Sequence, residues 1–438
     1  MNDQSDVESR VDSSRREFLK ATASAGLVAG LAPAVHGAGT DTVRVALVGC
    51  GGRGTGAAAN VLQTKANTRL VAMADAFADR IDLSLRGLAG QVDRDCLDVP
   101  EDRRFVGLDG YQHAIDSGVD LVLLCTPPGF RPLQFEAAVR AGKHVFLEKP
   151  VATDAPGVRR VLAANEEAKS KGLAVAVGHH LRHEEKHQDI IERIHDGAIG
   201  DLRYLRAYFN STGVWVRPRE PGQTEMQYQV RNWYYFTWLS GDHIVEQHVH
   251  DLDVCNWIKG SHPVEAQGVG GRQVRVGKEY GEIFDHHTVE FTYDDGVKLF
   301  SFCRHMPGCW NSFSQHAHGT HGSADIEGHG TATLQVAGQE PRRWRRDTVG
   351  HQVEMDELVE ALQSSRPYNE GDYGAMSTMT AILGRAASYS GKIVRWDEAF
   401  SSDIELVPRH IAWNTEPPLR PGPDGIYVCA MPGITKAL

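Results

Sequence analysis

The sequence predicts an α/β protein whose first half is a doubly wound, parallel sheet. Residues 43–49, VRVALVG, have the continuous apolar and β-branched character of a strand that is buried on both faces. Strand-like and helix-like segments alternate from there to about residue 150, which is typical of a parallel sheet with helices on both faces. The length of 438 residues leaves room for a second domain.

The expected elements follow one another at regular intervals. They are a strand at 43–49, a small-residue helix at 54–62, a strand at 68–75, a strand at 119–128, a helix at 133–144 and a strand at 144–150. Ligands of such sheets bind outside the carboxyl ends of the strands. Thr126, Pro127, Glu148 and Lys149 fall at such ends and are therefore candidate binding residues.

The first strand runs into a glycine-rich loop with the pattern G-x-G-x-x-G. Gly49 permits the tight turn, Gly51 lets a pyrophosphate approach the backbone, and Gly54 lets the following helix pack on the strand. Gly52 and Arg53 complete the loop. Because the pattern lies between a predicted strand and a predicted helix, it indicates a dinucleotide site.

Asp75 ends the second predicted strand, about twenty residues after the loop. A carboxylate there binds the ribose hydroxyls of NAD and repels a 2′-phosphate, so we expect NAD rather than NADP. The alternative is that Asp75 caps the next helix.

Composition excludes some classes of function. The net charge of −11 argues against nucleic acid as a partner. The seven cysteines are scattered without a CxxC pair, and the 21 histidines form clusters that match no compact zinc signature. We therefore predict no metal, although imidazole clusters leave that possibility open.

The N-terminus, residues 1–38, predicts a disordered start and a twin-arginine export signal. Arg15 and Arg16 precede Phe18, Leu19 and Lys20, and a mildly apolar, small-residue stretch follows. We expect export through the twin-arginine machinery to the periplasm.

Four motifs together resemble the Gfo/Idh/MocA oxidoreductases. They are VALVGCGGRGTG, LCTPP, AGKHVFLEKP and EQHVHDLDVCNW, in this order. The resemblance implies an NAD(P)-binding Rossmann domain at 41–165. It also implies an α+β substrate domain at 166–438, with a large, mostly antiparallel open sheet and a C-terminal tail. A face of that sheet often serves in oligomerisation, so we expect a homo-oligomer, either a dimer or a tetramer.

The resemblance also implies roles for single residues. Lys149 matches the active-site lysine near the nicotinamide, and Glu148 matches a carboxylate on the same side. Glu246, His250 and Asp253 match the acidic residue, histidine and aspartate of the second motif. Many relatives have Asp where this chain has Glu246, and many have a histidine after the Pro-Pro turn where this chain reads PPGFRP.

Oxidation of a secondary alcohol needs a proton acceptor for the hydroxyl and a hydride acceptor opposite the carbinol carbon. We expect His250 to accept the proton and Lys149 to polarise the same oxygen, but the opposite assignment stays open. A helix would place Glu246 and His250, one turn apart, on one face.

Further substrate contacts are expected from Asp253 of the second motif and from two other places. Arg182 lies where relatives have an arginine, and it is expected either to stabilise the domain junction or to touch the substrate. Trp233 and Tyr234 lie in the aromatic and arginine-dense segment 214–243, whose rings could stack on a sugar.

The predicted function is an exported, NAD(P)-dependent oxidoreductase for a secondary alcohol of a sugar, glycoside or polyol. Because free NAD is scarce outside the cytoplasm, we expect the cofactor to stay tightly bound and to be recycled within the site. The alternative enzyme is an NAD-dependent, redox-neutral glycoside hydrolase that oxidises, eliminates and reduces. A third possibility is a nucleotide- or sugar-binding protein without catalysis.

Overall fold

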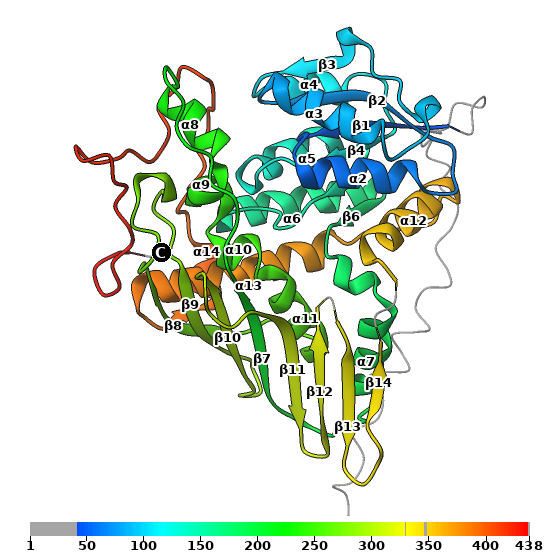
Figure 1. The fold of residues 1–438 in the computed structure, drawn as a ribbon. Helices are drawn as coiled ribbons and strands as arrows, with labels where there is room; N and C mark the ends of the chain where they lie inside the picture. Colours follow the sequence, from blue (N-terminus) through cyan, green and yellow to red (C-terminus); the bar gives the residue numbers. More distant parts are fainter. Residues whose placement is uncertain (1–41, 329, 346–347, 437–438) are drawn as a thin grey trace, which may run out of the picture. The chain divides into compact units, whose positions relative to one another are not determined.

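The computed structural model describes residues 42–328, 330–345 and 348–436. The first domain is a parallel sheet with helices on both faces (Figure 1). Its strands are β1 (Val43–Val48), β2 (Thr68–Asp75), β3 (Arg104–Val106), β4 (Leu121–Leu124), β5 (His144–Leu147) and β6 (Val175–Val177). Its helices are α2 (Gly52–Leu62), α3 (Ala78–Leu88), α4 (Gly110–Ile115), α5 (Arg131–Arg140) and α6 (Ala155–Ser170), with short 3-10 turns η1 (Arg94–Cys96), η2 (Glu101–Arg103) and η3 (Pro128–Phe130).

The strand order β3-β2-β1-β4-β5-β6 confirms the predicted doubly wound sheet. The chain reverses its direction of winding between β1 and β4, which pair in parallel. A crevice opens at such a switch point, outside the carboxyl ends of the two strands. The loops that follow Val48 and Leu124 therefore meet there.

The first sheet continues beyond the expected domain boundary at residue 165. β6 pairs with β5 from Val145 to Leu147, so the sheet ends at Val177. The expected range 41–165 misses this strand because it has only three residues, too few for a recognisable pattern.

The second domain contains a nine-stranded sheet in the order β14-β13-β12-β11-β7-β10-β9-β8-β15. β7 and β10 pair in parallel, and the other neighbours pair antiparallel. The strands are β7 (Leu202–Ser211), β8 (Glu265–Gly271), β9 (His286–Thr292), β10 (Lys298–His305), β11 (Ser312–Gly319), β12 (Gly322–Glu327), β13 (Ala332–Val336), β14 (Arg342–Trp344) and β15 (Val394–Arg395). This confirms the expected α+β second domain.

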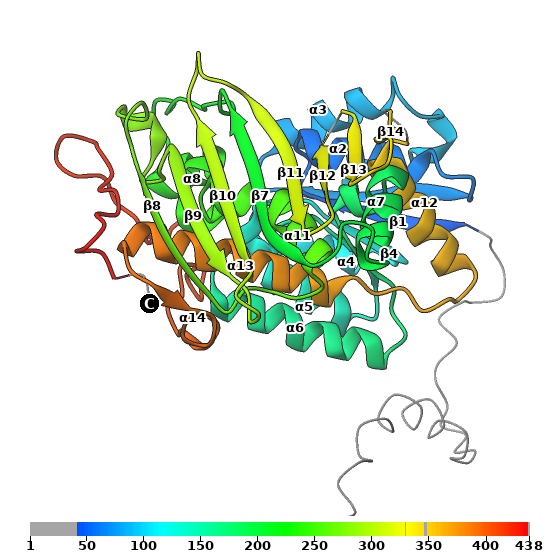
Figure 2. The same cartoon turned by 90° about the horizontal axis from the view of Figure 1, so that it is seen from below.

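Helices cover one face of this sheet. The helices and 3-10 turns after the first sheet are η4 (His180–His183), α7 (Glu185–His195), α8 (Glu225–Arg231), η5 (Trp233–Tyr235), α9 (Thr237–Ser240), α10 (His243–Glu246), α11 (Val249–Lys259), η6 (Lys278–Tyr280), α12 (Gly350–Gln363), α13 (Gly371–Ser390) and α14 (Trp396–Ser401). α13 packs on α6 of the first domain and on β8 and β9 of the second, and so joins the two domains (Figure 1). Among the described residues, no helix covers the other face of the sheet (Figure 2).

The predicted export signal, residues 1–38, lies outside the described residues. In the part of the chain that is described, no helix is both long enough and apolar enough to span a bilayer.

A buried histidine ties the loop after β6 to two helices of the second domain. His183 Nδ1 lies 2.9 Å from Glu357 Oε2 in α12, and its Nε2 lies 3.2 Å from Glu370 Oε1, just before α13. Burial by itself would lower the pKa of His183, but hydrogen bonds to Glu357 and Glu370 raise it to about 10.

We expect His183→Gln to reduce the free energy of unfolding by on the order of 3 kcal/mol below pH 6.5, because it leaves two carboxylates without their partner. Since the pKa is raised from 6.5 to about 10, this stabilisation is full below pH 6.5 and is lost as the pH rises through 10. Urea unfolding at a series of pH values measures it. The exposed His113→Gln is the control, and parallel stability curves for wild type and His183→Gln would contradict the assignment.

Candidate active site

A cavity of about 360 Å³ lies at the switch point of the first sheet. The predicted cofactor-binding residues that line it are Gly49, Gly51, Gly52, Arg53, Gly54, Asp75, Thr126 and Pro127. Of the predicted cofactor set, Glu148 and Lys149 are absent from this lining. The structure therefore brings together the residues that follow β1, β2 and β4.

The glycines leave room for a phosphate on one side and pack tightly on the other. Gly49 has φ +94°, and a Cβ there would lie 2.5 Å from the carbonyl carbon of Cys125. A Cβ on Gly54 would lie 2.0 Å from the carbonyl oxygen of Gly49. At Gly51 and Gly52, where α2 begins, a Cβ would meet nothing within 4 Å. This cradle fits the diphosphate of a dinucleotide, because backbone N–H groups at a helix start attract anions.

Asp75 is held in place by the glycine loop. Its Oδ2 accepts a hydrogen bond from the Cys50 backbone N–H (2.7 Å), and its Oδ1 accepts one from Phe77 N–H (3.0 Å). Burial raises the pKa of Asp75, and these two hydrogen bonds oppose the rise. A carboxylate has about four lone-pair positions, so this one retains capacity for ribose hydroxyls.

Glu148 supports the loop instead of lining the cavity. It is 2% exposed, and its Oε1 accepts a hydrogen bond of 2.6 Å from Arg53 Nε. Burial would raise its pKa, but the charges of Arg53 and Lys149 bring it below the ordinary value. Glu354 of α12 lies 3.8 Å from the same guanidinium. Two buried carboxylates thus fix Arg53 beside the cradle.

Lys149 and Glu246 join the two domains at the site. Lys149 Nζ donates to the backbone oxygen of Glu246 (2.5 Å) and to its Oε1 (3.0 Å). Each side chain is 11% exposed. Burial raises the pKa of Glu246, which Lys149 opposes. Glu246 lines the cavity, and Lys149, its ion-pair partner, is not part of that lining. Two of the three ammonium N–H groups are used, and the third has no partner among the described residues.

The expected single helix through Glu246 and His250 is wrong. Glu246 ends α10, and His250 belongs to α11, which starts at Val249. The break arises because His248 N–H bonds to the carbonyl of His243, five residues back, which widens the turn.

His250 lies in a group of imidazoles. The ring centroids of His179 and His180 are 5.9 and 4.8 Å from that of His250. Burial, followed by the positive charge of Lys149, lowers the pKa of His250 well below its ordinary value. His250 Nδ1 is buried without a hydrogen-bond partner among the described residues. The imidazole is therefore neutral at neutral pH, although His250 is not part of the cavity lining.

Arg182 and Asp253, both expected to contact substrate, bind each other. Arg182 donates from Nε and Nη2 to the two carboxylate oxygens at 2.8 and 2.9 Å, and Ser377 Oγ donates to Oδ1 at 2.7 Å. The guanidinium also lies 3.9 Å above the ring of Tyr373. This pair joins η4, α11 and α13, and the substrate role of both residues stays a prediction.

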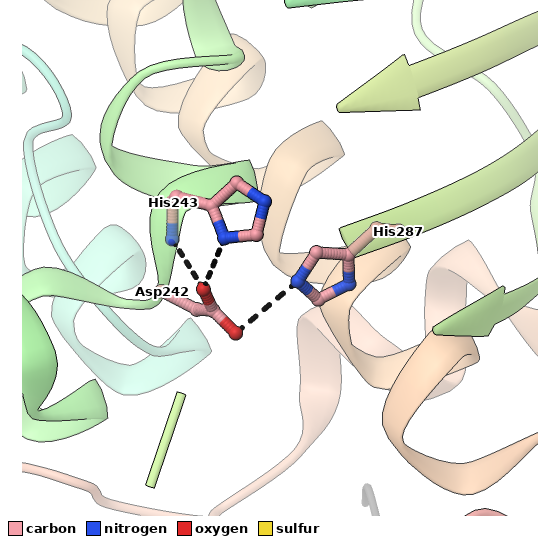
Figure 3. Close-up of side chains that lie close together, drawn as sticks. All are labelled: Asp242, His243 and His287. Atoms are coloured by element: carbon pink, nitrogen blue, oxygen red, sulfur yellow. Dashed lines mark hydrogen bonds and ion pairs between the residues drawn. The ribbon is translucent and has the colours of Figure 1, made fainter. Parts of the chain in front are cut away.

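A buried carboxylate that the sequence did not indicate organises the same region (Figure 3). Asp242 lies between two imidazoles: its Oδ1 is 2.7 Å from His243 Nδ1, and its Oδ2 is 3.2 Å from His287 Nε2. Tyr389 OH and the Phe284 backbone N–H also donate to Oδ2. Burial would raise the pKa of Asp242, but His287 and His243 bring it well below its ordinary value.

This is the group of possible metal ligands found among the described residues. The carboxylate of Asp242 already accepts hydrogen bonds on both oxygens, and burial lowers the pKa of His243 to about 4.

The triad of Asp242, His243 and His287 also reaches the cavity. The His243 ring is 4.5 Å from that of His305, and His305 Nε2 lies 2.9 Å from the side-chain oxygen of Gln247, which lines the cavity. We therefore interpret the triad as support for Gln247.

Residues 213–236 of the second domain form the opposite wall of the cavity. Trp233 and Tyr234 line it, as expected, together with Trp215 and Arg217. The hydroxyl of Tyr234 is buried without a hydrogen-bond partner among the described residues. Arg217 and Trp215 lie in the aromatic and arginine-dense segment 214–243, whose composition indicates such a role. Gln247 lies inside the motif EQHVHDLDVCNW, but that motif indicates function only for Glu246, His250 and Asp253.

We expect Gly54→Ala to lower stability by about 1–3 kcal/mol, because its methyl group would overlap the Gly49 carbonyl and push α2 off the sheet. NADH binding, followed by fluorescence, should weaken with it. Gly52→Ala is the matched control for stability, since a methyl group there would meet nothing within 4 Å. Equal destabilisation by the two variants in thermal unfolding would contradict the packing role of Gly54.

Comparison with known proteins covers both domains. Residues 43–179 match the Oxidoreductase family, NAD-binding Rossmann fold, and residues 187–325 match the GFO/IDH/MocA C-terminal domain. The inositol 2-dehydrogenase of Rhizobium meliloti (strain 1021) is 26% identical over 298 residues, which are 68% of this chain and 79% of that protein. The scyllo-inositol 2-dehydrogenase (NAD(+)) of Bacillus subtilis (strain 168) is 26% identical over 52% of this chain and 57% of that protein.

Solved structures share the fold. The aldose-aldose oxidoreductase from Caulobacter crescentus superposes with a TM-score of 0.64 at 20% identity, over 81% of this chain and 99% of that one. A levoglucosan dehydrogenase gives a TM-score of 0.64 at 15% identity with the same coverage. With both domains matched in sequence and the glycine cradle in place, this chain belongs to the GFO/IDH/MocA family of oxidoreductases.

Proposed function

We propose that the protein is an NAD-dependent oxidoreductase acting on a secondary alcohol of a sugar, glycoside or polyol. The observation that carries the proposal is the Lys149–Glu246 pair, placed at the carboxyl end of β5 beside a dinucleotide cavity. The relatives named as inositol dehydrogenases support a polyhydroxylated substrate.

The bound cofactor supplies the hydride acceptor for the carbinol carbon. The chain's own residues manage the hydroxyl proton. The free N–H of Lys149 donates to the substrate oxygen and stabilises it as it becomes negative. Glu246, at the cavity wall and with its pKa raised by burial, receives the proton. His250, which is neutral and outside the cavity lining, is the competing acceptor.

We also propose that the cofactor is NAD and that it is retained. Asp75, oriented by Cys50 and Phe77, favours free ribose hydroxyls over a 2′-phosphate. The twin-arginine pattern at 1–38 favours export to the periplasm, where a retained cofactor would be recycled by a second substrate or by the same one. Absorbance and mass spectra of nucleotide released from undialysed protein test this. Stoichiometric NAD is expected, and absence of nucleotide with no binding on titration would overturn the proposal.

Lys149→Met should lower kcat by at least a factor of about 10³, because it removes the group that stabilises negative charge on the substrate oxygen. Glu246→Gln should lower kcat by about 10², because it removes the acceptor of the hydroxyl proton. A panel of sugars, polyols and glycosides, followed by NADH fluorescence and product analysis, measures both. A keto product identifies the oxidoreductase, whereas a free reducing sugar with unchanged cofactor identifies the glycosidase.

His250→Gln separates the two proton acceptors. If Glu246 is the base, Glu246→Gln removes the acid limb of the pH profile, and His250→Gln retains it. The reverse result would assign the proton to His250. Full activity in all three variants would refute these residue roles. A wild type that binds dinucleotide but turns over no member of the panel would leave only a binding function.

We propose that the protein is a homo-oligomer joined through the open face of the nine-stranded sheet. That face carries stacked rings, with Tyr208 and Phe302 at 5.2 Å and Trp310 5.5 Å from Tyr208. Trp310 is 64% exposed. A group of half-buried and exposed aromatic rings on an uncovered sheet face is typical of a protein interface.

Phe302→Lys should convert the oligomer to monomers, because it places a charge at the centre of the interface. Light scattering after gel filtration measures the mass. Val428→Lys, on the exposed tail, is the control and should leave the mass unchanged. A wild-type monomer would refute the assembly.

A further inference from the structure

The wall of the cavity contributed by the second domain is a distinct structural unit. We call residues 213–236, which comprise a loop, α8 and η5, the cap. Its residues that line the cavity are Val214, Trp215, Arg217, Val230, Arg231, Trp233 and Tyr234. Figure 1 shows α8 beside the C-terminal segment drawn in red. That segment supports the cap from behind, since Tyr427 OH bonds to Glu225 and Gln229 Nε2 donates to the carbonyl of Leu419 at 2.7 Å.

Arg231 forms an ion pair between the cap and the first domain, beside the apolar packing of the cap on Phe77, Leu108 and Phe130. Arg231 Nη1 lies 2.8 Å from both carboxylate oxygens of Asp79, in the first turn of α3. Its guanidinium carbon lies 3.8 Å from the ring of Phe77, and Trp413 of the tail packs on that ring at 5.5 Å. The Arg231–Asp79 ion pair therefore lies just after Asp75 in the chain, at the end of the cavity where the adenosine ribose is expected.

The arginines that line the cavity differ in whether they have a carboxylate partner. Four arginines line it, and three of them have carboxylate partners: Arg53 pairs with Glu148, and Arg80 and Arg231 pair with Asp79. The described residues provide no carboxylate partner for Arg217.

Arg217 is half-buried, and its guanidinium carbon lies 5.2 Å from the ring of Trp215. Arg217 lines the same cavity as the glycine cradle and has no carboxylate partner among the described residues. Its guanidinium can therefore bind an anionic ligand.

We propose that Arg217 pairs with the diphosphate of the bound dinucleotide, opposite the glycine cradle, and that the Arg231–Asp79 pair keeps the cap closed over it. The inference rests on the proposed function only in requiring that the dinucleotide binds. Release of the dinucleotide then requires the cap to move, so the second domain sets how long the cofactor is retained.

The test is the rate at which bound nucleotide leaves the full-length protein, followed by mass spectrometry of the filtrate after dilution. Arg217→Gln should release nucleotide about tenfold faster or more, the size expected for loss of a charge-assisted hydrogen bond. Asp79→Asn should release it about two- to fivefold faster, as for an exposed ion pair. Arg217→Lys, which keeps the charge, should fall between wild type and Arg217→Gln.

Arg219→Gln is the matched control. Arg219 lies in the same cap but pairs with Glu225 and is outside the cavity lining, so its release rate should equal that of wild type. The exchanged pair Asp79→Arg with Arg231→Asp should restore slow release. Thermal unfolding identifies any variant that fails to fold.

The outcomes separate the two proposals. Wild-type protein that neither holds nor binds dinucleotide overturns the proposed function. Wild-type protein that holds it, with equal release from all variants, overturns the role of the cap alone. If Arg217→Gln changes only the KM of the sugar, Arg217 belongs to the substrate site and the inference is wrong.

Discussion

The contact between Lys149 and Glu246 is the interaction on which the site depends. Lys149 follows β5 of the first domain, and Glu246 ends α10 of the second. Each group depends on the other. Without Glu246, Lys149 would be an unpaired cation at the end of a strand, and without Lys149 the carboxylate of Glu246 would be buried without a counter-charge. Removing one partner of a buried pair is costly because the other charge remains desolvated. The pair therefore requires both domains to pack in one arrangement.

Several neighbouring contacts preserve that arrangement. Arg182 and Asp253 form a bidentate pair between η4 and α11, and α13 packs on both α6 and β8. Asp242 binds His243 and His287 and, through His305, reaches Gln247 at the cavity. The carboxylates of Asp242 and Asp253 accept hydrogen bonds on both oxygens, which specifies one packing where an apolar surface would allow several. These contacts hold the two domains, and with them Lys149 and Glu246, in one arrangement.

The cavity thus has two walls of different character. The first domain supplies backbone N–H groups and a carboxylate, arranged by local chain geometry at Gly49, Gly54 and Asp75. The second supplies aromatic rings and arginines from the cap. The first wall carries the cradle that fits a dinucleotide, whereas the second is the wall that we propose to set how long the dinucleotide stays.

The sequence by itself determined the first wall. A strand, a glycine loop and a terminal aspartate are local features, fixed by backbone sterics and by periodicity over short distances. Through a family resemblance it also indicated Lys149, Glu246 and His250 as catalytic candidates, with His250 as the expected proton acceptor. The contact between Lys149 and Glu246 came from the tertiary structure. Only the tertiary structure revealed the break between Glu246 and His250, the buried Asp242 triad, the mutual pairing of Arg182 with Asp253, and β6 beyond residue 165. These features depend on contacts between residues far apart in the chain, and no local pattern encodes which distant side chain will satisfy a buried charge.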